Sequence, residues 1–322
     1  MFPLHNLFNG QEQETNQDHK QPYSQALHKL AAFLAASPLA RAQRDLAYLK
    51  ERTTALEELV NVFEFEPLCR ARIPKENYDF IAGGVDHEWT LRRNREGFDR
   101  ITIHPRMMVN TSTMDLSVTL FGNKIAMPIL IAPTAGHQLA HPQGELATSK
   151  AAAACNTILC LSSNSSYPFE KVAEATNAVK WWQLYPREDD EATEERVKRA
   201  VASGFKAVVL TADAPYNSHR ERLLRNRVRA QVPSGDGNSG AATAAAAASR
   251  RRSSRPEEAP HPYRLQAALM SKWDWTYVSR LKDWAKVPVL IKGILTAEDA
   301  ALAVKHGADG IVVSNHGGRY LD

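Results

Sequence analysis

Residues 287–316 read VPVLIKGILTAEDAALAVKHGADGIVVSNH and contain the unit from which we infer the fold. Two short apolar runs, 287–293 and 309–315, flank one helix-like stretch at 296–307. Neither run shows a clear apolar–polar alternation, and strands of this kind are buried on both faces, as in parallel sheets. The stretch therefore predicts a strand–helix–strand unit with parallel strands.

Similar runs occur earlier in the chain, from Met127 onward, with helix-like segments at 143–155 and 190–203 between them. Strand–helix units that repeat about every 20 to 30 residues are typical of a (β/α)8 barrel or of a doubly wound sheet. The earlier strand-like runs are 127-MPILIAP, 158-ILCLSS, 180-KWWQLY and 206-KAVVLTAD, which makes six runs in all.

Two features of these runs favour the barrel. The Gly-x-Gly-x-x-Gly turn of dinucleotide-binding sheets does not follow the first run. Nearly every run ends instead in polar residues, and the carboxyl ends of barrel strands are where active sites are assembled. We therefore predict an α/β fold, a (β/α)8 TIM barrel. The polar residues at the strand ends are Thr134, Ser162, Gln183, Tyr185, Thr211, Asp213, Lys292, Ser314 and His316.

The composition excludes several classes of protein. Of the 322 residues, 43% are hydrophobic and 24% charged, which is typical of a globular protein. The net charge of +4 is too small to indicate nucleic-acid binding. No apolar run reaches the roughly 18 residues of a membrane span. Three cysteines without zinc-type spacing indicate a reduced, cytoplasmic protein with no metal site.

Two regions lie outside the repeating pattern. Residues 1–72 read as a polar tail followed by an amphipathic helix through about Leu59. We favour this over a cleaved signal because the charges ahead of the apolar stretch 30–40 are mixed and lie far from Met1. Residues 233–260 interrupt the barrel region, 73–322, with a low-complexity sequence rich in Gly, Ser, Ala and Arg. Its arginines have no interleaved aromatic residues, so we interpret it as a solvated loop and not as a nucleic-acid patch.

The strand ends also carry residues that can take part in catalysis or in ligand binding. His316 is followed by two glycines, which allow the backbone to approach a ligand. Asp213 ends the fourth run and is expected at the same end of the barrel as His316, where a carboxylate can orient an imidazole and stabilise its charge. Arg220 and Arg319 can bind a carboxylate through paired charge-assisted hydrogen bonds. Lys292 ends an apolar run, a position that favours contact with a ligand anion.

At these residues the sequence resembles the FMN-dependent α-hydroxy-acid oxidase and dehydrogenase family, which includes glycolate oxidase, lactate oxidase, lactate dehydrogenase and mandelate dehydrogenase. The resemblance covers residue 73 to the last residue, apart from the insertion. It implies FMN as cofactor, oxidation of a small (S)-2-hydroxy acid to the 2-oxo acid, an acceptor such as oxygen, a quinone or a cytochrome, and a homotetramer. The matching stretches are 73-IPKENYDFIAGGVDHEWTL, 128-PILIAPTAGHQLAHPQGELATSKAA, 161-LSS, 183-QLY, 210-LTAD, 292-KGILTAEDA and 314-SNHGGR.

The resemblance also implies a role for each site residue. His316 matches the catalytic base that takes a proton from the substrate, and Asp213 matches its charge partner. Lys292 matches a lysine beside the N1 and O2 edge of the flavin, where a cation stabilises the charge of the reduced ring. The positions that match substrate contacts are Phe80, Tyr185, Arg220 and Arg319. Those that match cofactor contacts are Pro133, Thr134, Ala135, Ser162, Gln183, Thr211, Lys292 and Ser314.

The sequence departs from the family pattern at three positions. Phe80 stands where the family places a substrate-contacting tyrosine, so one hydrogen bond, worth about 1.5–3 kcal/mol to a charged group, is absent. Asn164 stands where glycolate oxidases carry a bulky tryptophan, so substrate size does not carry over. Tyr320 replaces a glutamine.

The chain ends at Asp322, directly after the sixth strand-like run. A family member continues with two further strand–helix units that hold the FMN phosphate, at the place where barrels commonly bind phosphate. We therefore expect a barrel truncated after its sixth strand, with weak FMN binding. Two alternatives stay open: an inactive remnant of such an enzyme, and another FMN barrel that acts on a phosphorylated substrate.

We expect limited proteolysis of the native protein to cut first within 233–260, because this sequence has almost no large apolar side chain to pack. Mass spectrometry of the first fragments would locate the cut. A protease-resistant insertion would contradict the interpretation.

Overall fold

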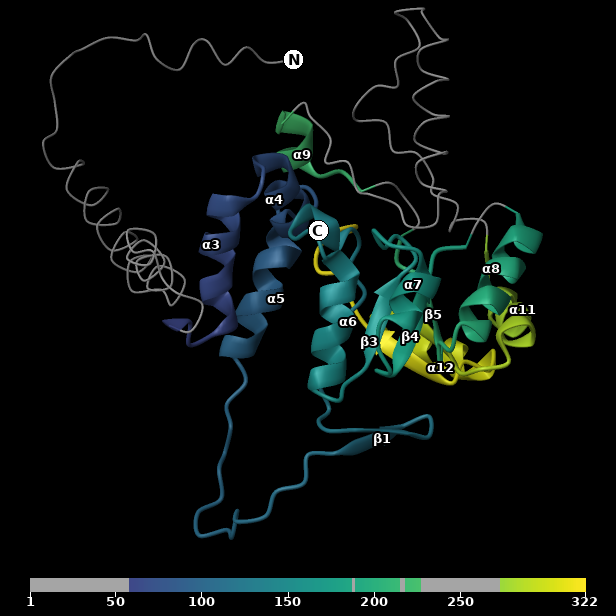
Figure 1. Ribbon diagram of the computed structural model, residues 1–322, viewed down its shortest axis with the longest axis horizontal. Helices are drawn as coiled ribbons and strands as arrows, with labels where there is room; N and C mark the ends of the chain where they lie inside the picture. Colours follow the sequence, from purple (N-terminus) through teal and green to yellow (C-terminus); the bar gives the residue numbers. More distant parts are fainter. Residues whose placement is uncertain (1–57, 187–188, 215–217, 227–272) are drawn as a thin grey trace, which may run out of the picture. The chain divides into compact units, whose positions relative to one another are not determined.

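The computed structural model describes residues 58–186, 189–214, 218–226 and 273–322 (Figure 1). The chain divides into two compact units, Met1–Arg72 and Ile73–Asp322. The described part of the first unit contains the short 3-10 helix η3 (Val62–Glu64) and helix α3 (Phe65–Arg72). The insertion 233–260 and nearly all of the helix expected before Leu59 lie outside the described residues. Within the described ranges, no helix is both long and apolar enough to cross a membrane.

The second unit is built on a five-stranded parallel sheet in which the strands follow one another in chain order. This confirms the predicted α/β class and five of the six expected strands. Helices connect the strands, and two of them begin with side-chain caps: Asp189 accepts a hydrogen bond from Glu191 N, and Thr296 accepts one from Asp299 N. The strands are β3 (Leu159–Ser162), β4 (Lys180–Leu184), β5 (Val208–Thr211), β6 (Val289–Ile294) and β7 (Gly310–Val313). Helix α6 (Gly144–Ala154) precedes β3, and the helices between the strands are α7 (Phe169–Glu174), α8 (Asp190–Ala202), α9 (Glu221–Asn226), α11 (Thr276–Ala285) and α12 (Ala297–Lys305).

The first expected strand, 127–133, is not a strand in the structure. It makes a single parallel bridge, between Ile131 and Leu159, ahead of β3. Pro128 and Pro133 have no N–H to donate, and proline is confined to the ends or edges of a ladder for that reason. The two prolines therefore limit this segment to a bridge.

The strands alternate between two hydrophobic cores, although their sequences look uniformly apolar. In β3 and β4, Leu159 and Trp182 pack into one core with the helices, whereas Cys160 and Trp181 pack into the other. Successive side chains of a strand point to opposite faces, so this alternation is expected once both faces are buried. The second core, which we call the inner core, contains Ile125, Ile158, Cys160, Trp181, Ala207, Val209 and Leu290.

A hairpin covers one end of the inner core. Strands β1 (Val118–Leu120) and β2 (Asn123–Ile125) pair antiparallel, with Val118 opposite Ile125. Ile125 is fully buried in the inner core, and the Phe121 and Trp181 rings lie 5.7 Å apart. The hairpin thus closes the inner core away from the carboxyl ends of the strands. Helices α4 (Lys75–Ala82) and α5 (Trp89–Asp99) and the 3-10 helix η4 (His137–Leu139) complete the described part of this unit.

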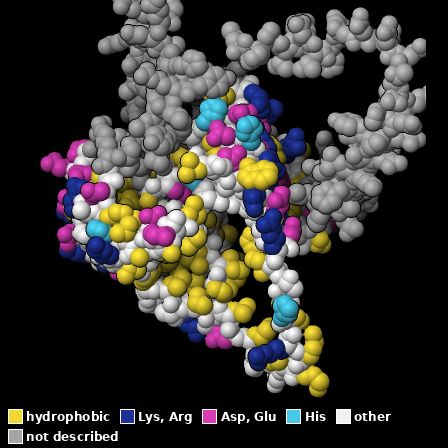
Figure 2. All heavy atoms as spheres, turned by 180° about the vertical axis from the view of Figure 1, so that it is seen from behind, with side chains coloured by type: hydrophobic (Ala, Val, Ile, Leu, Met, Phe, Trp, Pro, Cys, Tyr) yellow, Lys and Arg dark blue, Asp and Glu magenta, His cyan; other side chains and the backbone are white. Residues whose placement is uncertain are grey.

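Hydrophobic side chains are exposed on the face shown in Figure 2. Two exposed apolar residues mark the two edges of the sheet: Val313 on β7 is 72% exposed, and Ile129, beside the bridge, is 66% exposed. Contiguous exposed apolar surface commonly marks a place where further protein packs.

Strand β6 contains a bulge immediately before its carboxyl end. The pairing with β7 shifts between Lys292 and Ile294, and Gly293 between them has φ +111°. A Cβ at Gly293 would lie 2.6 Å from Asp213 Cγ and 2.9 Å from Asp213 N. Only glycine fits here, because the backbone angle and the approach of Asp213 both exclude a side chain.

We expect Gly293→Ala to lower the free energy of unfolding by about 2 kcal/mol or more, since it combines backbone strain with a clash against Asp213. Gly204→Ala is the matched control, because Gly204 also has a positive φ (+97°) but nothing lies within 4 Å of its Cβ position. Urea unfolding of both variants would give the difference. Equal losses would show that the contact with Asp213 is unimportant.

Candidate active site

A chain of hydrogen bonds joins the carboxyl ends of three neighbouring strands. Ser162 Oγ donates to Gln183 Oε1 at 3.0 Å, and Gln183 Nε2 donates to Thr211 Oγ1 at 2.8 Å. All three side chains are buried and continue the inner-core face of β3, β4 and β5. Buried polar groups need such partners because an unpaired one costs about 1–3 kcal/mol. The chain leaves one N–H of Gln183 unused among the described residues.

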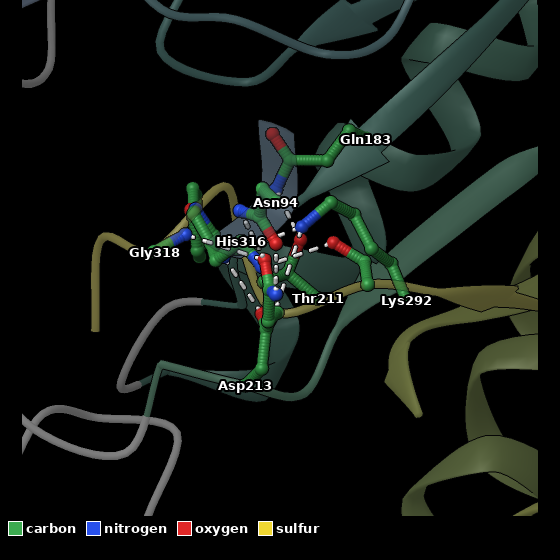
Figure 3. Close-up of polar contacts among 10 residues, drawn as sticks. Asn94, Gln183, Thr211, Asp213, Lys292, His316 and Gly318 are labelled. Carbon is green, nitrogen blue, oxygen red and sulfur yellow. Dashed lines mark hydrogen bonds and ion pairs between the residues drawn. The ribbon is translucent and has the colours of Figure 1, made fainter. Parts of the chain in front are cut away.

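A charged cluster follows at the ends of β5, β6 and β7 (Figure 3). His316 Nδ1 lies 2.7 Å from Asp213 Oδ1 and 3.3 Å from Lys292 Nζ. Lys292 Nζ is also 3.6 Å from Asp213 Oδ2, an oxygen with no hydrogen-bond partner within the described ranges. Asp213 therefore contacts both the imidazole and the ammonium group.

The loop after β7 holds His316 in an unusual conformation. His316 has φ +58°, and Gly317 and Gly318 both have φ +67°, so three successive residues are left-handed. Ser314 Oγ accepts a hydrogen bond from His316 N at 3.0 Å. Asn315 pairs with Asn94 of α5 through reciprocal amide hydrogen bonds of 2.5 and 3.1 Å. These contacts fix the loop that presents the imidazole.

The contacts of His316 define its protonation. A proton on Nδ1 is donated to Asp213, which leaves Nε2 as the basic nitrogen. Tyr185 Oη lies 3.1 Å from Nε2 and can donate to it. Burial lowers the pKa of His316, and the Lys292 charge lowers it further, while the hydrogen bond to Asp213 opposes both effects. The imidazole is therefore neutral, and able to accept a proton, at neutral pH.

Two arginines lie close to this cluster. Arg220 donates from Nε to Ser218 Oγ at 2.8 Å and from Nη1 to the Phe80 carbonyl at 3.2 Å, and its guanidinium lies 5.3 Å from the Phe80 ring centre. Arg319 donates from Nη1 to the Gly83 carbonyl at 2.5 Å and from Nη2 to that of Ile81. Burial and the Arg220 charge lower the pKa of Arg319 to about 10. The two guanidinium groups are thus close enough to repel each other.

The turn at Pro133–Ala135 has different partners. Thr134 Oγ1 contacts His137 Nε2, and His137 Nδ1 lies 2.9 Å from Thr148 Oγ1. Gly136 N, next to the turn, donates to the Asn164 carbonyl at 3.2 Å. The described hydrogen bonds thus tie this turn to α6 and to the loop after β3.

The comparisons with known proteins agree with this arrangement. The family model described as FMN-dependent dehydrogenase matches residues 69–322. The chain belongs to the FMN-dependent dehydrogenase family. It is 41% identical over 269 residues to a peroxisomal (S)-2-hydroxyacid oxidase of Arabidopsis thaliana, a match that covers 83% of this chain and 71% of the relative.

Two further relatives support the assignment. The chain is 39% identical over 269 residues to glycolate oxidase 1 of Zea mays, covering 82% of this chain and 70% of the relative. A crystal structure of mandelate oxidase superposes with a TM-score of 0.70 at 33% identity, covering 82% of this chain and 71% of that one. The flavin of this family of enzymes is FMN, so its fit to the strand ends can be tested.

The side chains at the strand ends fit the polar edge of a flavin ring, which carries two carbonyl oxygens and ring nitrogens. The unused N–H of Gln183 and the hydroxyls of Ser162 and Thr211 offer donors and acceptors. Lys292 adds a buried cation whose pKa is lowered by burial and supported by Asp213. A cation beside an electron-accepting ring stabilises the charge that the ring gains.

Three contributors to the site did not stand out in the sequence. Asn94 supports the His316 loop from 221 residues away in the chain, and only the fold reveals that pairing. Gly293 follows Lys292 directly, and a glycine at the end of an apolar strand is a signal of a bulge. Tyr320 appeared only as a departure from the family pattern, yet its ring centre lies 4.5 Å from that of His316.

The lowered pKa of His316 gives a pH-dependent prediction. A group with a depressed pKa stays deprotonated below its usual value, so kcat/KM should stay level down through pH 6.5 and fall only at lower pH. Asp213→Asn removes the contact that raises this pKa, so the acid limb should move to still lower pH while kcat falls.

His316→Gln should lower kcat by about 10² to 10⁴, the usual cost of losing a general base. The control is His104→Gln, at an exposed position, which should leave the profile unchanged. An acid limb above pH 6.5 in the wild type, or near-normal turnover by His316→Gln, would contradict the assignment.

Proposed function

We propose that the protein oxidises a small (S)-2-hydroxy acid to the 2-oxo acid with FMN, and that His316 is its catalytic base. The observation that carries the proposal is the His316–Asp213 pair, whose Nδ1 and Oδ1 atoms lie 2.7 Å apart. The charge of Arg220 acts on both His316 and Arg319. A base next to paired positive charges suits a substrate with an ionisable hydroxyl or C–H beside a carboxylate. The names of the relatives point to the same class of substrate.

The protein side of the reaction follows from these contacts. His316 Nε2 accepts one proton from the substrate, and Asp213 holds the other ring nitrogen protonated so that Nε2 faces the substrate. The imidazolium that forms is stabilised by the Asp213 carboxylate. FMN, when bound, supplies the acceptor for the two electrons and the second hydrogen. Lys292 then balances the negative charge that accumulates at the strand ends.

The carboxylate of the substrate is assigned to Arg220 and Arg319. Both side chains are half-buried, and burial lowers the pKa of each guanidinium. An anion between them relieves the repulsion and forms charge-assisted hydrogen bonds. Arg319 uses one N–H on each terminal nitrogen for the α4 carbonyls, so we assign it the outer contact and Arg220 the principal one.

We further propose that the strands belong to an FMN-type TIM barrel, with residues 1–72 as a separate N-terminal extension. A tetrameric state and a cytoplasmic location stay predictions from the sequence, and oxygen, a quinone and a cytochrome stay open as the terminal acceptor.

The proposal is tested with the purified protein reconstituted with FMN. Anaerobic addition of (S)-lactate, glycolate or (S)-mandelate should bleach the visible absorbance of the oxidised flavin. Retention of the oxidised spectrum with all three acids would overturn the proposed function.

Arg220→Lys keeps the charge but loses the planar fork, so we expect KM for the acid to rise about tenfold or more. The matched control is Arg225→Lys, at an exposed residue of α9 that pairs with Glu221. The methyl ester of the same hydroxy acid should be a poor substrate for the wild type. Equal turnover of acid and ester would contradict the carboxylate assignment.

A further inference from the structure

Tyr320 lies beside His316 and Tyr185, although the sequence analysis assigns no function to this position. Its ring is edge-on to the His316 imidazole, with centres 4.5 Å apart and planes at 72°. Its phenol oxygen accepts a hydrogen bond from the phenol of Tyr185, and Tyr185 Oη itself lies 3.1 Å from His316 Nε2. Tyr320 is therefore beside the nitrogen that receives the substrate proton.

The same phenol lies within the field of Arg220. The positive charge of Arg220 acts on the phenol of Tyr320, as it does on that of Tyr185. A phenol O–H beside a guanidinium is a neutral donor at the place where the site concentrates positive charge. Such a donor adds a hydrogen bond to an anion without adding repulsion between cations.

Contacts on both sides of Tyr320 hold it in place. Arg319 binds the carbonyls of Ile81 and Gly83 at the end of α4, and Asp322 Oδ1 accepts a hydrogen bond from Thr90 N in α5 at 2.6 Å. The segment between these anchors contains only Tyr320 and Leu321. A side chain anchored in this way loses little further conformational freedom when a ligand binds.

The ring that contacts Arg220 directly has no hydroxyl. Phe80 contacts the guanidinium through its ring face and its carbonyl, and it has no O–H to donate. Among the described neighbours of Arg220, a phenol donor is available from Tyr185 and Tyr320 and not from Phe80. The single O–H of Tyr185 is already taken up by its neighbours Tyr320 and His316 Nε2, whereas Tyr320 accepts from Tyr185 and keeps its own O–H free.

We propose that Tyr320 is a substrate-binding residue, whose phenol O–H donates to the carboxylate that Arg220 holds. The inference rests on the proposed function, since it concerns the same anion. Oxalate is an unreactive dicarboxylate, so its binding measures the contact between the Tyr320 hydroxyl and a carboxylate without turnover.

Tyr320→Phe keeps the ring against His316 and removes only the hydroxyl. We expect the Kd for oxalate, measured by calorimetry on the FMN-loaded protein, to rise about ten- to a hundredfold, as for a lost hydrogen bond to a charged group. KM for the hydroxy acid should rise in parallel. We expect kcat to stay within about threefold and the pH profile to be unmoved, because the base and its partner are intact.

The matched control is Tyr167→Phe, whose hydroxyl donates to the Pro142 carbonyl at 3.0 Å at an exposed site. It should leave the Kd for oxalate unchanged. Normal oxalate binding and KM in Tyr320→Phe would overturn the assignment, as would an equal loss in the control. A wild type that neither binds oxalate nor oxidises a hydroxy acid would instead overturn the proposed function together with the inference.

Discussion

Side chains two residues apart on a strand point to the same face of a sheet, and this period of two determines how the candidate site is built. Cys160 leads to Ser162, Trp181 to Gln183, and Val209 to Thr211, so the face that packs the inner core becomes the polar face at the strand ends. Because the strands are parallel and adjacent in chain order, these ends meet at one edge. The same residues that stabilise the core therefore set the positions of the groups above it.

The parallel sheet and the polar residues at its edge could be predicted from the sequence, because the apolar runs and the residues that end them can be recognised there. Short apolar runs separated by helix-like segments predicted the parallel strands, and the polar residues at the end of the runs predicted the shared edge. The contact between Asp213 and His316, 103 residues apart, then follows from the fold class. The reduction of the 127–133 run to an isolated bridge at Ile131 could not be predicted. Whether two prolines prevent an otherwise strand-like run from pairing depends on the neighbouring strand.

The details that escaped prediction are contacts between side chains distant in the chain. The pairing of Asn94 with Asn315 and the anchoring of Arg319 on the α4 carbonyls depend on where α4 and α5 pack, and no local pattern specifies that packing. The resemblance implies a substrate contact for Arg319, and the structure shows hydrogen bonds from its guanidinium to the Gly83 and Ile81 carbonyls. The effect of the Arg220 charge on Arg319 likewise depends on the distance between the two half-buried guanidinium groups, which the sequence does not contain.

The bulge at Gly293 has a consequence for the space above Lys292. By residue parity Ile294 should share the face of Leu290 and Lys292, yet it packs with Ile291 in a cluster on the helical side. The extra residue inverts the phase of the strand, so Lys292 is the last side chain of β6 to point inward. Beyond Lys292, β6 has no further side chain that covers the charged cluster of Asp213, Lys292 and His316. A planar molecule at the strand ends would therefore have space above the Lys292 side chain. In a regular strand the side chain of residue 294 would fill that space.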